Sequence, residues 1–305
     1  MENNWNQPKE YIEVDGHKIP FFSERFGKNT EKMPELLSDR RVPVSIARRA
    51  QRILDKTGVS ATWTDNYADT GDLKAQKGSE VKLILTTYAD GSLTDLGREA
   101  LSWINSQEEL TNRAVALGID RRYKQLQEEE NGVFTRKRDK LAEFIDEPLT
   151  EQQALDSFFW KVAHRHPDVV PEQFAIPGLH EQIVPYLFSE FQRRFAPRTE
   201  KNEIKIMAVY PGTVSDDVAE LRAWCVAGLG NGSSAYGGGD LGGGLGRLLA
   251  EIAPEVPNAL GKGTRIPPYT QADVERYTKG VSALRQTFGD TSQVIQNLAS
   301  LEGKV

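Results

Sequence analysis

The sequence has little of what disulfide-bonded and membrane-spanning proteins need. Its 305 residues include one cysteine, Cys225, which excludes an intrachain disulfide and is typical of a reducing compartment. No apolar run reaches the roughly 18 residues of a membrane span, and the first residues do not follow the pattern of a secretory signal. We therefore expect a cytoplasmic protein that has no membrane partner.

The chain also lacks an excess of positive charge. Its formal net charge is −6, with 38 lysines and arginines against 44 aspartates and glutamates. Proteins that coat nucleic acid are basic, so any such binding here has to rely on a local cluster of cations. Apolar residues make up only 38% of the chain, which is typical of a protein with much solvated surface.

The motifs of common enzyme classes are incomplete in this sequence. The nearest approach to a phosphate-binding P-loop ends in Gly261-Lys262-Gly263, where a serine or threonine should follow the lysine. The dinucleotide fingerprint is incomplete too, because Ser233 stands where its third glycine belongs. The G-x-S-x-G motif of a serine nucleophile is absent as well. We therefore predict no catalytic residue and no cofactor, and we lean against an enzyme.

Three histidines, His164, His166 and His180, raise the question of a zinc site. They lack the H-E-x-x-H spacing and the cysteine pair that would support such a site. A polar helix end explains His164 and His166 equally well, because a helix C-terminus favours cationic side chains. We therefore predict no metal site.

Glycine is concentrated in one tract, residues 228–246, where it fills ten of nineteen positions. Apolar residues at helical spacing on either side predict helices over 215–227 and 245–253. The tract would then join two helices, and its glycines give the backbone freedom to adopt positive φ angles.

This tract allows two interpretations. In one, an anion binds at the start of the second helix, where backbone amides are unpaired, through Gly243, Gly244, Gly246 and Arg247. In the other, the glycines form a flexible or packing loop. Both interpretations remain open at this point.

A basic helix is predicted over residues 43–56. Its basic residues, Arg48, Arg49, Arg52 and Lys56, share one side of the helix, since positions three and four apart are neighbours. Little local charge opposes them, and such a face could bind phosphate groups of nucleic acid. The alternative is a solvated face, or one paired with acidic residues such as those at 128–130.

The fold class predicted from these patterns is α+β, predominantly α-helical with a small sheet. The sheet would hold an N-terminal hairpin, over residues 11–22 around Asp15-Gly16, and strands near 81–88 and 204–210. The acidic stretch 65–72 is predicted as a turn, and 23–42 as irregular. Further helices are expected over 92–104, 107–130, 134–145, 150–164, 179–195, 273–288 and 292–301.

The sequence divides into three regions: an N-terminal α+β region at 1–106, a helical region at 107–200 and a glycine-rich region at 201–305. A single domain is the alternative. The function predicted is a non-enzymatic cytoplasmic interaction or assembly protein, with other protein subunits as partners. One alternative is a nucleic-acid-binding protein that uses the helix at 43–56. The other is an enzyme or anion-binding protein that uses the glycine tract, with Asp240, Ser233 or Ser234 in its site.

Overall fold

The computed structural model places fourteen stretches of the chain, and the structural statements below concern these residues only. They are residues 11–14, 17–20, 22–55, 67–107, 110–111, 113–118, 122–127, 129–137, 149–195, 209–210, 218–226, 235–236, 241–242 and 246–252. Contacts within the chain form two compact units, Met1–Glu255 and Val256–Val305, and the described residues all belong to the first. The helices predicted at 273–288 and 292–301 lie outside the described residues.

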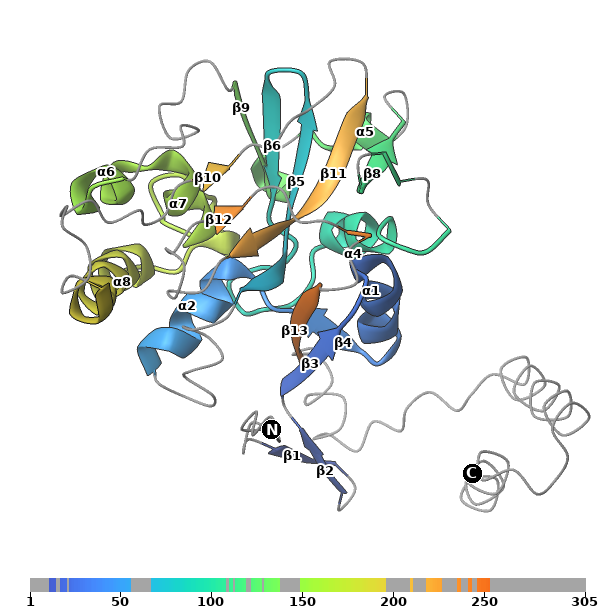
Figure 1. The fold of residues 1–305 in the computed structure, drawn as a ribbon, viewed down its shortest axis with the longest axis horizontal. Helices are drawn as coiled ribbons and strands as arrows, with labels where there is room; N and C mark the ends of the chain where they lie inside the picture. Colours follow the sequence, from blue (N-terminus) through green and yellow to red (C-terminus); the bar gives the residue numbers. More distant parts are fainter. Residues whose placement is uncertain are drawn as a thin grey trace, which may run out of the picture. The chain divides into compact units, whose positions relative to one another are not determined.

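A mixed sheet of 11 strands is the framework of the first unit (Figure 1). Its central strand, β5 (Ala68–Lys77), pairs antiparallel with β6 (Glu80–Ile84) and β11 (Ala219–Val226), and parallel with β13 (Arg247–Ile252). The longest path through the sheet runs β10-β12-β11-β5-β13-β3. The other strands are β3 (Phe22–Phe26), β4 (Arg41–Pro43), β7 (Leu110–Thr111), β8 (Ala114–Leu117), β9 (Val133–Lys137), β10 (Val209–Tyr210) and β12 (Ala235–Tyr236).

The predominantly helical fold with a small sheet is therefore wrong. The helices expected over 215–227 and 245–253 are the strands β11 and β13, so the glycine tract joins two strands. The physical reason is burial: all six residues of β13 are buried, so its apolar residues run together instead of alternating. A buried strand of this kind cannot be told from a helix by periodicity alone.

Two more predicted helices also contain strands. The segment 134–145 begins as β9, and the segment 107–130 holds β7, β8, the short helix α5 (Arg122–Gln125) and part of the 3-10 turn η1 (Glu129–Asn131). The prediction of a turn over 65–72 is wrong for residues 68–72, which belong to β5. Its polar side chains misled the prediction because their partners lie far away in the sequence.

Other elements are confirmed. The N-terminal hairpin forms from β1 (Tyr11–Val14) and β2 (His17–Pro20), with Val14 opposite His17. Helices occupy parts of 43–56 and 92–104 and all of 179–195. The prediction that 23–42 is irregular is wrong, because these residues hold most of β3 and β4 and a further helix. These helices are α1 (Asn29–Ser38), α2 (Ile46–Asp55), α4 (Asp95–Ser102) and α8 (Leu179–Phe195).

The helix predicted over 150–164 is two helices, α6 (Glu151–Asp156) and α7 (Phe158–Ala163). Thr150 and Gln153 form a capping box at the start of α6. Ser157 ends α6 with extended backbone, and its hydroxyl accepts a hydrogen bond from the Trp160 amide as the cap of α7. A serine that caps a new helix thus breaks what reads as one continuous apolar stripe.

The main core lies where α2, α6, α7 and α8 meet the sheet. Phe159 and Trp160 of α7 are buried against Trp224 of β11, and the Phe159 and Trp224 rings meet edge to face with centroids 6.4 Å apart. Val162 is also buried, while Leu155 and Phe158 are half-buried against the same cluster. No helix in the described part of the chain is long and apolar enough to cross a membrane.

Candidate functional site

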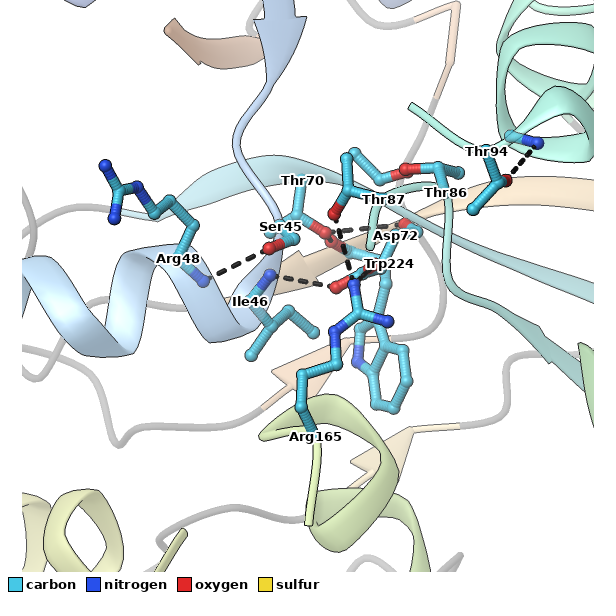
Figure 2. A network of polar contacts seen from close by, with 12 residues as sticks. Ser45, Ile46, Arg48, Thr70, Asp72, Thr86, Thr87, Thr94, Arg165 and Trp224 are labelled. Carbon is cyan, nitrogen blue, oxygen red and sulfur yellow. Dashed lines mark hydrogen bonds and ion pairs between the residues drawn. The ribbon is translucent and has the colours of Figure 1, made fainter. Parts of the chain in front are cut away.

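A buried ion pair lies at the centre of the polar network in Figure 2. Asp72 of β5 is fully buried, and Arg165, which follows α7, is 1% exposed. The guanidinium Nη2 lies 3.0 Å from the Asp72 carboxylate. Arg165 has a positive φ of 62°, so the chain turns sharply after α7 and directs this side chain towards the sheet.

The second oxygen of Asp72 fixes the start of a helix. It accepts a hydrogen bond of 2.9 Å from the amide of Ile46, the first residue of α2. A carboxylate at this position satisfies an amide that has no partner within the helix and interacts favourably with the helix dipole. One buried side chain thus joins the central strand, α2 and the end of α7.

Threonine hydroxyls extend this network across the sheet. Thr70 donates to the Trp224 carbonyl over 2.7 Å, and Thr86 donates to the Gly71 carbonyl over 2.9 Å. Thr87 accepts a hydrogen bond of 3.3 Å from Arg165. Each hydroxyl therefore connects two segments of the protein and is not presented to solvent as a nucleophile.

Burial dominates the electrostatics of the pair. It raises the pKa of Asp72, against the opposing effects of Arg165 and of backbone hydrogen bonds from Ile46 and Thr86. Burial likewise lowers the pKa of Arg165, and the Asp72 carboxylate opposes that change. Since both groups are shielded from water, Asp72 is not placed to exchange a proton with an external substrate.

A small cleft lies beside this pair. Its volume is about 20 Å³, enough for roughly one water molecule. Arg48 and Tyr88 line it together with Arg165, and Arg165 Nη1 is a buried donor with no acceptor among the described residues. The cleft can hold a water molecule or the tip of one side chain.

The predicted basic face of α2 is directed largely at the protein itself. Arg48 and Arg52 each place Nε 2.8 Å from a different carboxylate oxygen of Glu251 in β13. Arg49 is buried and donates to the Val226 carbonyl over 3.1 Å, and burial lowers its pKa to about 10. Lys56 lies outside the described residues. These three arginines are not arranged as open phosphate contacts, and nucleic-acid binding stays a prediction.

The anion site predicted at the end of the glycine tract depended on a helix that starts there, and the structure has no such helix. A strand, β13, begins at Arg247, so no helix N-terminus is present there. Gly246 packs so closely on the Gly27 carbonyl and Asn29 that a side chain would not fit. Arg247 is buried and donates to the Tyr67 carbonyl over 3.0 Å. Gly243 and Gly244 lie outside the described residues.

The three histidines form a chain of contacts between α7 and α8. The Nδ1 atoms of His164 and His180 are 3.0 Å apart, and His166 Nε2 is 2.6 Å from a Glu181 carboxylate oxygen. Within the described residues, no group of three or more histidine, cysteine, aspartate or glutamate side chains could hold a metal ion.

Sequence reasoning missed the central pair. Asp72 was assigned to a polar turn and Arg165 to a helix end, and 93 positions separate them. Glu251 was missed as the partner of Arg48, 203 positions away, because it was assigned to a helix. No local pattern in the sequence signals either contact.

Comparisons with known proteins add little to this geometry. No protein-family model matches the sequence, and no curated protein sequence matches it. One solved structure, described as "Accommodation of massive sequence variation in Nanoarchaeota by the C-type lectin fold", aligns with a TM-score of 0.47 and 12% identity. The alignment covers 75% of this chain and 95% of that chain. This likeness is too weak to carry a fold or a function over to the present protein.

Proposed function

We propose that this chain is a non-enzymatic cytoplasmic interaction or assembly protein. The supporting observation is that charged side chains form ion pairs within the protein: Asp72 pairs with Arg165, and Glu251 pairs with both Arg48 and Arg52. These contacts connect segments far apart in the sequence. Charges used in this way favour a single well-defined arrangement of the segments that they connect, as a scaffold requires.

Exposed aromatic side chains offer places for a protein partner. Phe26 is 55% exposed, Tyr67 43% and Tyr88 37%. Phe26 and Tyr67 both lie next to Arg247, whose guanidinium carbon is 5.9 Å from the Phe26 ring and whose Nη1 contacts the Tyr67 carbonyl. Aromatic side chains contribute much of the binding energy of protein interfaces, so these exposed rings suit a protein partner better than a small substrate.

The test is the mass of the full-length chain in solution, measured by light scattering at low and high salt together with the absorbance ratio at 260 and 280 nm. We expect a defined assembly heavier than the 34.1 kDa monomer, or a stoichiometric complex with a co-purifying protein, with no nucleic-acid absorbance. A salt-independent monomer with no bound protein would contradict the proposal, as would a 260 nm signal that disappears at high salt.

The exposed aromatic side chains provide the matched variants for this test. Phe26→Ala with Tyr67→Ala should lower the assembled fraction, because both truncate exposed rings. Val169→Ala truncates a half-buried side chain packed against the core and is the control. An equal loss of assembly in both proteins would mean that the aromatic positions have no special role.

A further inference from the structure

The junction of α7 and α8 holds two buried histidines in direct contact. His164 ends α7, His180 is the second residue of α8, and both are at most 2% exposed. Their Nδ1 atoms are 3.0 Å apart, and the Trp160 ring stacks on His164 with centroids 5.3 Å apart. His180 Nε2 also lies 3.0 Å from the carbonyl oxygen of Leu155 in α6. This contact places α6, α7 and α8 around one pair of imidazoles.

The neighbours decide where the protons lie. A carbonyl oxygen only accepts, so His180 Nε2 carries the proton that it donates to Leu155. The Nδ1 of a neutral His180 then has a free lone pair, and His164 Nδ1 donates to it. Only one proton fits between the two nitrogens. If both rings become protonated, each Nδ1 carries a proton, so two N–H groups point at each other and the hydrogen bond is lost.

Burial outweighs the groups that would favour a charge on this pair. Burial lowers the pKa of His164 well below its usual value, and His180 lowers it further. Burial also lowers the pKa of His180, helped by His166 and Lys161, whereas Leu155 and Glu181 act in the opposite direction. Glu181 also contacts His166, whose Nε2 lies 2.6 Å from its carboxylate. A proton is therefore taken up more readily when the pair is exposed to water.

We propose that the His164–His180 pair is an acid-sensitive latch that holds α8 against α6 and α7 at neutral pH and releases it in mild acid. The helix so released carries the buried apolar residues Ile183, Val184, Leu187, Phe188 and Phe191. Their exposure would offer a hydrophobic surface that neutral pH conceals. This regulation is independent of the proposed assembly function.

The direction of the pH dependence follows from the protonation states of the closed and open forms. When α8 opens, each imidazole returns to its ordinary pKa of about 6.5, above its value in the closed form. The latch is thus fully effective above about pH 6.5 and weakens as the pH falls below it. When the pH falls from 7.5 to 5.5, the equilibrium constant for opening α8 increases up to about tenfold for each histidine that stays neutral in the closed form. For the pair, the increase is up to about a hundredfold.

Hydrogen exchange of the full-length chain at pH 7.5 and 5.5, corrected for the intrinsic exchange rates, measures this opening. We compare α8 with the central strand β5 in the wild type, His164→Asn, His180→Gln and the double variant. Asparagine keeps an amide near the Nδ1 position and glutamine keeps one near Nε2, so each substitution retains one donor without a titrating ring. His17→Asn, in the N-terminal hairpin, is the control.

We expect α8 to lose about a hundredfold of protection in acid in the wild type and in the control, with a much smaller change in β5. In the single variants, the protection of α8 should fall by about tenfold between the two pH values, and in the double variant it should hardly change. If the double variant does not fold, the two single variants still decide the question. An equal loss in all proteins, or an equal loss in α8 and β5, would overturn the latch.

Discussion

At the residue scale, the pair Asp72–Arg165 is the feature on which the buried network depends. Both side chains are at most 1% exposed, and four contacts meet there: the ion pair, the Ile46 amide, the Thr87 hydroxyl and the Thr86 amide. Removing both charges of such a pair can be nearly neutral, but removing one leaves the other buried without a counter-charge. The two halves of the pair should therefore not behave additively when they are mutated.

Asp72→Asn should destabilise the protein by about 3–5 kcal/mol, because Arg165 would remain buried and unpaired. Adding Arg165→Met to this variant should recover part of the loss, and urea unfolding of both proteins measures the difference. The control is Asp39→Asn, which breaks the exposed contact with Arg25 and should cost under about 1 kcal/mol. A double variant that is less stable than Asp72→Asn alone would contradict this expectation.

Little of this site could be predicted from the sequence, for a reason visible in its residues. Asp72 stands in a run of polar residues, DNYADTGD, that is typical of an exposed turn. Its burial is explained by its contacts with Arg165 and with the Ile46 amide. The sequence gives no sign that either residue lies near it. The cluster of basic residues in α2 is visible in the sequence, but the acid that pairs with two of them, Glu251, lies 203 positions from Arg48.

At the element scale, sequence patterns identify helices with one buried face but misassign β11 and β13, where both faces are buried. Helices α2 and α8 carry an apolar stripe on one side, and their positions were predicted. Strands β11 and β13 have at most two residues that are not buried, so they lack the alternation by which a strand is recognised. The hairpin at 11–20 was found because Asp15-Gly16 specifies a tight turn in any context.

The short helix α7 is expected to be essential to the core. Phe159 is fully buried against Trp224, so Phe159→Ala should cost about 3–5 kcal/mol of unfolding free energy, through lost burial and a cavity. Phe158→Ala, one position away, is the control. That ring is only half-buried, with the Arg136 guanidinium carbon 3.5 Å above it, and its loss should be clearly smaller. Equal losses in chemical denaturation would mean that α7 packs on both rings alike.

At the scale of the whole molecule, the arginines of α2 can have one of two roles. They bind nucleic acid, or they pair with acidic residues of the protein itself. The net charge of −6 opposes approach to phosphates unless a free cationic cluster overcomes it. Arg48 and Arg52 have Glu251 between them, and its side chain is 11% exposed. Their guanidinium groups are therefore expected to support the packing of α2 on β13.

The two roles give opposite results for Arg48→Gln/Arg52→Gln. If α2 supports packing, the variant unfolds more easily by on the order of 2 kcal/mol, because Glu251 loses both partners. Duplex DNA should then bind the wild type and the variant equally weakly, with no salt dependence that distinguishes them. If α2 contacts four phosphates, the wild type should show a slope of about −3.6 in log affinity against log salt, and the variant a slope flatter by about two units.

Arg98→Gln/Lys124→Gln is the matched control, because it removes two positive charges from exposed positions away from α2. Fluorescence anisotropy at several salt concentrations and urea unfolding on all three proteins separate the outcomes. A flattened slope only in Arg48→Gln/Arg52→Gln, with unchanged stability, would assign α2 to nucleic acid. A loss of stability only in that variant, with no slope to flatten, would assign its arginines to the scaffold, as the 2.8 Å contacts with Glu251 lead us to expect.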